Sequence, residues 1–328
     1  MCKLNYRFIT KLHNLSLNTV MENGTKINDF LKISNSSRNI DELFDNSPFR
    51  SCIGEINYND IGNGVYIYAV GSIKDLLGEV RDDYNANNYL DILLRAAQDF
   101  VNSLWLIKDN SVFIKDGYLQ MYHKGDIFGS NVVSNSLSLM PVTASCEMEN
   151  IVFSREEIIS AREIFNENPL DVKNSTKEQL RFPSKNPLTK TSGRIGRANY
   201  FTIIARDTKS LPIKILNYCT ALECLFTSDN SEVTHKISER LARYLGTDLQ
   251  QRKEFFQLVK DAYKIRSKAI HGQAIKDNKE NMIRISVGLD NTLRNIFITY
   301  YSSEEKSKAF DITNNTDYED WFTELILN

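Results

Sequence analysis

Hydrophobic and polar positions follow different patterns in the two halves of the chain. Before about residue 150, short runs rich in β-branched and aromatic residues are separated by Gly, Asn or Asp, which is typical of strands. We expect strands at 6–9, 53–58 and 65–70. The runs 112–115 and 118–122 flank Asp116-Gly117, a dipeptide that favours a tight turn, so they predict a hairpin.

Two helices are predicted among these strands. Apolar residues recur at helical spacing from Leu90 to Trp105, which predicts an amphipathic helix that packs on the sheet. Ser154 and Glu157 have the spacing of a capping box and predict a helix that continues to about Phe165. Residues 1–168 therefore read as an α+β domain, with sensing or regulation as its expected role.

From Arg194 onward the pattern is helical almost throughout. We expect helices at about 194–208, 212–226, 232–245, 249–270 and 276–301, and their short connections predict an all-α bundle over 194–303. The preceding stretch, 169–193, is basic and broken by prolines, so it reads as a linker. The last stretch, 304–328, is an acidic amphipathic tail that either covers a basic cleft, docks a partner or packs as a helix on its own domain.

Composition narrows the class of protein. A chain of 328 residues favours two domains, and 41% hydrophobic with 25% charged residues is ordinary for a globular protein. The five cysteines form no CxxC pair or Cys/His cluster, so we expect no metal, no cofactor and no disulfide framework. No apolar run approaches the roughly 20 residues that span a bilayer, so we expect a cytoplasmic protein without a membrane partner.

Arg266 and His271 are the strongest candidates for chemistry. An arginine is a fixed cation whose planar fork binds phosphate oxygens, and a histidine exchanges protons near neutral pH. Positions five apart point about 140° away from each other on an ideal helix, so we expect Gly272 to end the helix and re-aim His271. The alternative is an arginine on a solvated face and a histidine near a helix end.

The surrounding segments carry a family resemblance. The segments are Tyr218-Cys219-Thr220-Ala221-Leu222-Glu223-Cys224-Leu225-Phe226, then Thr234-His235-Lys236-Ile237-Ser238-Glu239-Arg240-Leu241-Ala242, then Tyr263-Lys264-Ile265-Arg266-Ser267-Lys268-Ala269-Ile270-His271-Gly272. Their order resembles the Apea-like branch of the HEPN superfamily, over about residues 194–301. The resemblance implies a HEPN helical bundle in which two protomers share one cleft. It also implies metal-independent cleavage of RNA by attack of the ribose 2′-OH, which leaves a 2′,3′-cyclic phosphate.

The resemblance also assigns roles to single residues. It implies proton transfer by His271 and stabilisation of the phosphorane-like transition state by Arg266. Ser267 either orients phosphate or His271, as the resemblance implies, or is a surface serine. Tyr263 either lines the cleft or packs in the core. Glu223 needs a partner if it is buried, and Arg240 is the partner we expect, in an ion pair inside the bundle.

A local basic patch is the expected contact for RNA, because the net charge of −2 gives no overall basic field. Its members Lys185, Lys190, Arg194 and Arg197 are candidate RNA-binding residues. The alternative is a solvated basic linker.

Two functions from different classes follow. The first is a homodimeric HEPN endoribonuclease that cleaves RNA, with tRNA as one candidate, in a toxin or phage-defence setting with an antitoxin or a phage-derived trigger as further partner. The second is a non-catalytic HEPN module that binds RNA or a protein.

Overall fold

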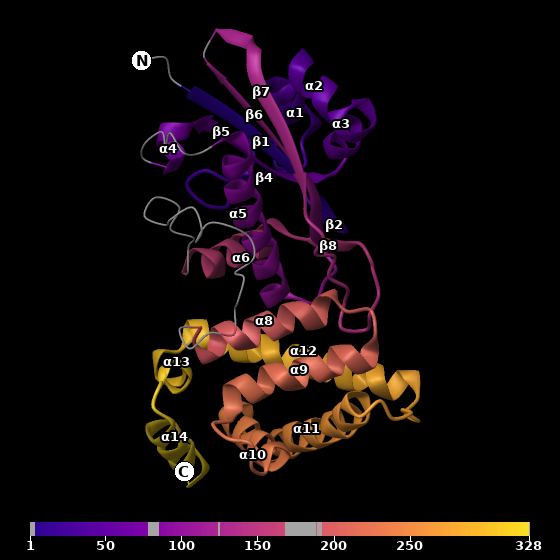
Figure 1. Cartoon of the computed structure of the whole chain (residues 1–328), viewed down its shortest axis with the longest axis vertical. Coiled ribbons are helices and arrows are strands. Elements are labelled where there is room, and N and C mark those ends of the chain that lie inside the picture. The colour runs from indigo at the N-terminus through magenta and orange to yellow at the C-terminus, as the bar shows by residue number, and fades with distance from the viewer. Residues whose placement is uncertain (1–3, 78–84, 124, 168–187, 189–191, 328) are drawn as a thin grey trace. The chain divides into compact units, whose positions relative to one another are not determined.

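The computed structural model describes residues 4–77, 85–123, 125–167, 188 and 192–327 (Figure 1). Contacts divide the chain into two compact units. The first, the sheet unit, comprises Met1–Met140 and Glu149–Ser184, and the second, the helical unit, comprises Pro141–Met148 and Lys185–Asn328. An α+β region followed by a helical region is the predicted order, and it is confirmed. The predicted domain 1–168, however, contains a stretch, 141–148, that packs with the helical unit.

A six-stranded antiparallel sheet, in the order β3-β4-β5-β1-β6-β7, organises the sheet unit. Its strands are β1 (Leu4–His13), β3 (Thr25–Lys26), β4 (Lys32–Ser34), β5 (Val65–Ser72), β6 (Phe113–His123) and β7 (Asp126–Ser136). A separate parallel pair joins β2 (Leu15–Leu17) to β8 (Ile151–Phe153). The predicted strands at 6–9 and 65–70 lie within β1 and β5.

Helices cover both faces of this sheet. The core on one face joins Phe8 and Ile67 to α5 (Ala86–Ile107) and α6 (Arg155–Glu167). The core on the other face joins Ile9 and Tyr66 to α1 (Ser37–Phe44), α2 (Ser47–Ile53) and α3 (Glu55–Gly62), whereas α4 (Ile73–Leu77) follows β5 directly. Because successive residues of a strand point to opposite faces, Phe8 and Ile9 serve different cores. The predicted helices at 90–105 and 154–165 are confirmed as α5 and α6.

The capping box of α6 is also confirmed. The Glu157 amide donates to Ser154 Oγ at 3.2 Å, and the Ser154 amide donates to Glu157 Oε2 at 2.8 Å.

The predicted strand at 53–58 is wrong, because this stretch forms the end of α2 and the start of α3. Asn46 caps α2 by accepting a hydrogen bond from the Phe49 amide at 3.1 Å, and Gly54, with φ of 81°, separates the two helices. Ile53 at the end of α2 and Tyr58 in α3 are buried, whereas Ile56 is 86% exposed. Tertiary packing therefore overrides the strand propensity of the segment.

The predicted hairpin at Asp116-Gly117 is also wrong. Both residues lie inside β6, where Gly117 is opposite Thr10 of β1 and Asn135 of β7. A Cβ atom on Gly117 would lie 2.5 Å from Leu94 Cδ2 of α5. The glycine therefore makes room for a helix and does not form a turn.

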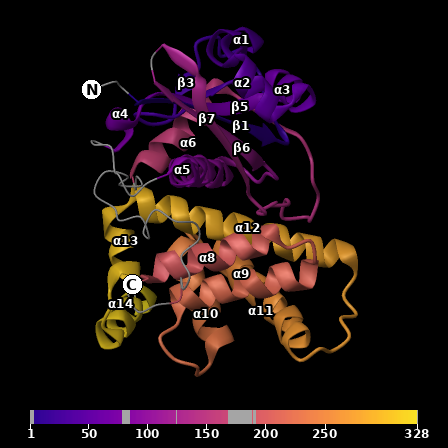
Figure 2. The same cartoon turned by 45° about the horizontal axis from the view of Figure 1, so that its top comes forward.

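Seven helices of the described chain form the helical unit, and α9 packs against α8, α10, α11 and α12. Their bounds are α8 Arg194–Asp207, α9 Leu211–Phe226, α10 Val233–Leu245, α11 Leu249–Ile270, α12 Lys279–Ser302, α13 Glu304–Asp311 and α14 Asn315–Leu327. Figures 1 and 2 both show α8 and α9 side by side. The five helices predicted over 194–301 are present, and the tail 304–328 forms α13 and α14.

The stretch Pro141–Met148 is held against this bundle by main-chain hydrogen bonds. The Val142 amide donates to the Arg206 carbonyl at 2.8 Å, and Ser286 Oγ of α12 donates to the Ala144 carbonyl at 2.6 Å. Both Val142 and Ala144 are buried. The helical unit is therefore completed by a segment that lies between β7 and β8 in the sequence.

Candidate functional site

The candidate site is built on α9 and α11, two helices that pack against each other. Glu223 lies one turn before the end of α9. Tyr263 and Arg266 are three residues apart on α11, so they share the helix face that meets α9. We call these three residues the Arg266 cluster.

Hydrogen bonds tie the Arg266 cluster together. Tyr263 Oη donates to Glu223 Oε1 at 2.8 Å. Arg266 Nη2 lies 2.8 Å from Glu223 Oε1 and 3.1 Å from Oε2. The Arg266 guanidinium carbon lies 5.3 Å from the centre of the Tyr263 ring. One carboxylate thus holds both the cation and the phenol of α11.

Burial controls the pKa of Tyr263. It raises the pKa of Tyr263, and the neighbouring Cys219 and Glu223 raise it further. Burial likewise raises the pKa of the Cys219 thiol. Tyr263 therefore remains a neutral hydrogen-bond donor at physiological pH, and its ring supports Arg266.

Part of the Arg266 guanidinium remains open to a ligand. Its side chain is 25% exposed, and its Nε is buried without a hydrogen-bond partner among the described residues. Nη2 is taken by Glu223, whereas Nη1 is neither buried nor hydrogen-bonded to a described residue. Nη1 is therefore the nitrogen that can meet an anionic oxygen.

His271 is the C-cap residue of α11. The Gly272 amide donates to the Ala269 carbonyl at 3.3 Å, and the Gln273 amide donates to the Lys268 carbonyl at 2.9 Å. These are the two hydrogen bonds of a Schellman motif, and Gly272, with φ of 62°, has the left-handed conformation that the motif requires. Gly272 thus ends the helix as predicted.

The reversal of the chain occurs after His271. His271 itself, with φ of −86° and ψ of 7°, stays close to helical geometry, so the chain changes direction at Gly272. The His271 side chain is exposed, and no described residue forms a hydrogen bond or ion pair with its ring. Arg266 faces α9, and no hydrogen bond joins it to His271 within the described chain. Ser267 is exposed between them, and its carbonyl accepts the His271 amide at 3.2 Å.

The expected ion pair between Glu223 and Arg240 is wrong. Glu223 pairs with Arg266, and Arg240 pairs with Glu319 of α14. Arg240 Nη1 also donates to the Phe226 carbonyl at 2.8 Å, and the guanidinium carbon lies 4.8 Å from the Phe322 ring centre. Arg240 points toward the end of α9 and toward α14, whereas Glu223 faces α11. Sequence reasoning missed Glu319, since no local pattern links it to α10.

The prediction that Arg194 binds RNA is wrong, because its side chain is buried and hydrogen-bonded inside the helical unit. It is 9% exposed, its Nη1 donates to the Thr227 carbonyl at 2.7 Å, and its guanidinium carbon lies 3.7 Å from the Tyr318 ring centre. Burial lowers the pKa of Arg194 from its usual value. Arg194 therefore joins α8 to α9 and α14 inside the helical unit.

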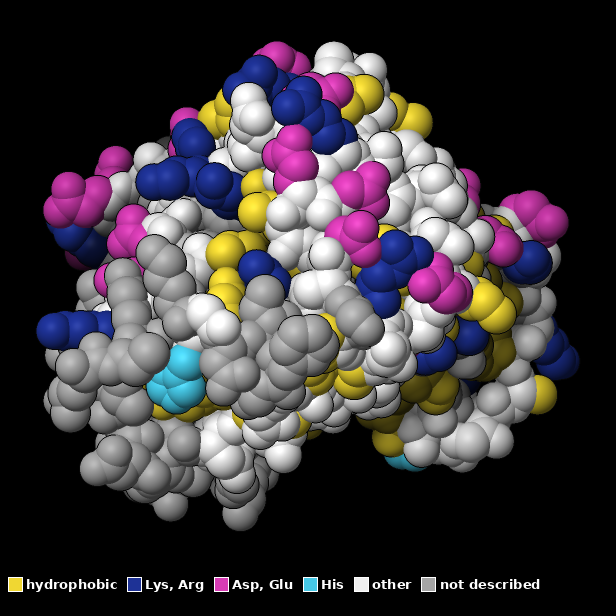
Figure 3. All heavy atoms as spheres, turned by 90° about the horizontal axis from the view of Figure 1, so that it is seen from above, with side chains coloured by type: hydrophobic (Ala, Val, Ile, Leu, Met, Phe, Trp, Pro, Cys, Tyr) yellow, Lys and Arg dark blue, Asp and Glu magenta, His cyan; other side chains and the backbone are white. Residues whose placement is uncertain are grey.

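The rest of the predicted RNA-binding patch is only partly described. Arg197 is partly exposed and donates to the Ser192 carbonyl. Lys185 and Lys190 lie outside the described residues. On the face shown in Figure 3, Lys and Arg side chains alternate with Asp and Glu side chains, so the described residues of that face present mixed charge.

Comparisons with known proteins give no relative: no family model, curated protein or solved structure matches the chain. Over the described residues, no group of three or more His, Cys, Asp or Glu side chains is placed to hold a metal ion. Within the same residues, no helix has the length and apolar character needed to cross a membrane.

Proposed function

We propose that this chain is a metal-independent endoribonuclease of the HEPN type that acts as a homodimer. One observation carries the proposal: Arg266 is fixed by Glu223 and Tyr263 with Nη1 open, on the helix whose last residues expose His271. A preorganised cation and a free imidazole together can cleave RNA without a metal, because one stabilises the charged transition state and the other transfers protons.

The proposed chemistry is an internal transfer at phosphorus. A neutral His271 removes the proton from the ribose 2′-OH as its oxygen attacks the adjacent phosphorus. The bond from phosphorus to the 5′-oxygen breaks, and a protonated His271 of the second protomer gives that oxygen a proton. The products are a 2′,3′-cyclic phosphate and a 5′-OH. Arg266 Nη1 donates to the phosphoryl oxygens, where negative charge builds up in the transition state.

The geometry of one chain supports the dimer. Arg266 faces α9, His271 faces solvent, and no described contact joins them, which favours a site that a second copy completes. The ends of α11 from two copies would supply two histidines and two arginines to one cleft. Light scattering should therefore give twice the chain mass of 37.7 kDa.

The decisive assay uses purified full-length protein and total RNA in EDTA. We expect cleavage in the wild type and in His235→Ala, and none in Arg266→Ala or His271→Ala. The product ends should resist phosphatase until mild acid opens the cyclic phosphate. The full chain is required, because a truncation at residue 190 would also remove Pro141–Met148 from the helical unit.

A second candidate is a non-catalytic HEPN module that binds RNA or a protein partner. The neutralisation of Arg266 by Glu223 within the same chain favours it, since a paired arginine also serves packing. RNA that is bound but left intact by the wild type, across all RNA classes, would establish this function instead. The first proposal includes a biological setting. We propose that the nuclease is a toxin or a phage-defence effector in the cytoplasm. The sheet unit would sense an antitoxin or a phage-derived trigger.

A further inference from the structure

The helix that carries Arg266 forms a strongly basic pair with its neighbour. α10 and α11 pack against each other, and together they contain nine Lys or Arg residues and three Asp or Glu residues. The chain as a whole has a net charge of −2, so its remaining residues are acidic in balance. A local excess of one sign of charge attracts a partner of the opposite sign. The partner of this helix pair should therefore be an anion.

Three exposed lysines of α11 share one helix face with His271. They are Lys253, Lys260 and Lys264, and we call them the lysine track. They precede His271 by 18, 11 and 7 residues, which are close to five, three and two whole helical turns. The three side chains therefore point within about 20° of the direction of His271, which is also exposed.

The lysine track runs along the helix toward His271. At 1.5 Å per residue, Lys253 lies about 27 Å from His271 along the helix axis, and Lys264 lies about 10 Å from it. His271 keeps a near-helical backbone, with φ of −86° and ψ of 7°, so the line of side chains continues to its ring. A strand whose reacting phosphate lies at His271 can therefore place its neighbouring phosphates along the track.

Two cations of the lysine track are free to bind a ligand. Lys253 and Lys260 form no ion pair with a described residue. The acids of α11 have other partners, since Asp261 lies 2.8 Å from Lys264 Nζ and Glu254 accepts a hydrogen bond from a glutamine of the preceding turn at 2.8 Å. Lys264 thus shares its charge with Asp261, whereas the other two lysines keep theirs.

The lysine track offers charge rather than a stacking surface. Phe256 is the partly exposed aromatic residue beside it. Lys260 Nζ lies 5.6 Å from the centre of the Phe256 ring, and the His235 ring lies 6.0 Å away at 82°. Because the ring already has these two neighbours, we expect contacts to phosphates rather than to bases. Phosphate contacts position a strand and carry no sequence information.

We infer that the lysine track binds the phosphate backbone of a single RNA strand and leads it to His271. The inference rests on the proposed ribonuclease function, because His271 gives the track its end point. A single strand is the favoured occupant, since attack by the ribose 2′-OH in line with the leaving 5′-oxygen needs a nucleotide that a duplex does not constrain. Binding should tolerate any sequence, because the track contacts phosphates.

The first probe is a single DNA strand of about 20 nucleotides, which exceeds the usual site size and cannot be cleaved without 2′-hydroxyls. With the full-length chain, fluorescence anisotropy should give a dissociation constant that rises steeply between about 50 and 200 mM salt. The RNA strand of the same sequence should bind His271→Ala with similar affinity, because the contacts are to phosphates. A complementary strand annealed to this RNA should protect it from cleavage by the wild type.

A double variant removes the two free cations of the lysine track. Lys253→Ala combined with Lys260→Ala should lower the slope of log K against log salt by about 1.4, since each phosphate contact to a single strand contributes about 0.7. Affinity at about 50 mM salt should fall about tenfold. For RNA cleavage, KM should rise and kcat should stay within about twofold, because the lysines lie away from the reacting phosphate. Thermal unfolding should not change, since both side chains are exposed.

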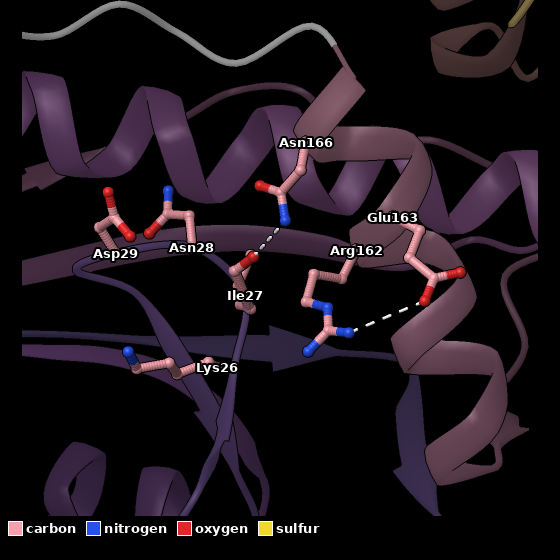
Figure 4. Close-up of a pocket in the computed structure, with 7 residues that line it drawn as sticks. All are labelled: Lys26, Ile27, Asn28, Asp29, Arg162, Glu163 and Asn166. Carbon is pink, nitrogen blue, oxygen red and sulfur yellow. Dashed lines mark hydrogen bonds and ion pairs between the residues drawn. The ribbon is translucent and has the colours of Figure 1, made fainter.

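The matched control removes two lysines from other surfaces. Lys26 lines a pocket of the sheet unit (Figure 4). The other charged residues of that pocket are Asp29, Arg162 and Glu163, so its charges balance. Lys26→Ala combined with Lys209→Ala, at an exposed lysine between α8 and α9, changes the net charge by the same amount. This control should leave the salt slope, the affinity and KM as in the wild type.

The outcomes separate this inference from the proposed function. An unchanged salt slope in the Lys253 and Lys260 double variant would overturn the track, and RNA cleavage by that variant would leave the nuclease intact. A slope that falls as expected, without cleavage of any RNA, would keep the strand-binding surface and overturn the nuclease. Binding of poly-glutamate as tight as that of the DNA strand would assign the surface to an acidic protein and would also overturn the inference.

Discussion

Two arginine–carboxylate clusters beside the end of α9 differ in what they leave open. In the first, which we call the Arg240 cluster (Ser228, Arg240 and Glu319), the Arg240 side chain is 6% exposed and both of its terminal nitrogens are hydrogen-bonded. In the Arg266 cluster, the arginine is 25% exposed and Nη1 remains open.

The comparison separates structural from functional use of the same side chain. Arg240 contacts a main-chain carbonyl, a carboxylate and an aromatic ring, and these contacts join α9, α10 and α14. Neither of its terminal nitrogens is left for a ligand. Arg266 is positioned equally well but still has a donor for a ligand. We therefore expect replacement of Arg240 to destabilise the protein, and replacement of Arg266 or His271 to abolish activity.

The largest expected effect is on catalysis. His271→Ala should lower the rate of RNA cleavage about 10²- to 10⁴-fold, because it removes the group that transfers protons. The free energy of unfolding should not change, since the His271 side chain is exposed and has no described partner. His235→Ala, at another exposed histidine, is the matched control and should cleave normally. Equal rates for the two variants would exclude His271 from the reaction.

Replacement of Arg240 should give the largest loss of stability. Arg240→Ala removes a buried cation from Glu319 and the Phe226 carbonyl and should cost about 3 kcal/mol in urea unfolding. Arg243→Ala, on the same helix and without a described ion pair, should cost far less.

The cost of Arg240→Ala should also depend on pH. Burial raises the pKa of Glu319, but hydrogen bonds from Arg240 and Ser228 outweigh it and hold that pKa below its usual value. The stability from this ion pair is therefore present above the ordinary glutamate pKa of about 4.3 and is lost as the pH falls through the lower folded value. A cost that stays constant down to pH 2 would contradict this account.

A change at Gly272 tests whether the end of α11 positions His271 for cleavage. Gly272→Ala forces an L-residue into the left-handed conformation and should cost about 1 kcal/mol, with a loss of cleavage because His271 is displaced. Gly196→Ala is the control: a Cβ there meets open space, and the exchange within α8 should be neutral or stabilising. Thermal unfolding and cleavage of both variants give the comparison.

The smallest effect is expected for Tyr263→Phe. This change removes one hydrogen bond to Glu223 and should cost about 1 kcal/mol or less, while the ring continues to support Arg266. Cleavage should fall only a few-fold, because Glu223 still holds Nη2. A loss as large as that of Arg266→Ala would show that the hydroxyl itself contacts RNA.

Local signals in the sequence predicted helix ends in both units well. The capping box at Ser154 of α6 and Gly272 at the end of α11 act within a few residues, so they can be recognised along the chain. Asp116-Gly117 gave a wrong hairpin prediction because Gly117 makes room for Leu94, a residue of α5 that packs against β6. That contact joins residues distant in sequence and has no local signal.

The partners of charged side chains were harder to predict. The sequence predicted Arg240 as the partner of Glu223, whereas Glu223 pairs with Arg266 because its side of α9 packs against α11. Arg240 meets Glu319 only because α14 folds back on α10, which no periodicity in the sequence specifies. The candidate site residues could thus be named from the sequence, whereas the partner of each charged side chain depended on tertiary packing.

The most direct test of the central claim is the rate of RNA cleavage in EDTA per folded molecule. It should be compared for the wild type, Arg266→Ala and Arg240→Ala at a temperature where the folded fraction of each is known. We expect Arg240→Ala to match the wild type once unfolded protein is discounted, and Arg266→Ala to be inactive although fully folded. Normal cleavage by folded Arg266→Ala would contradict the account.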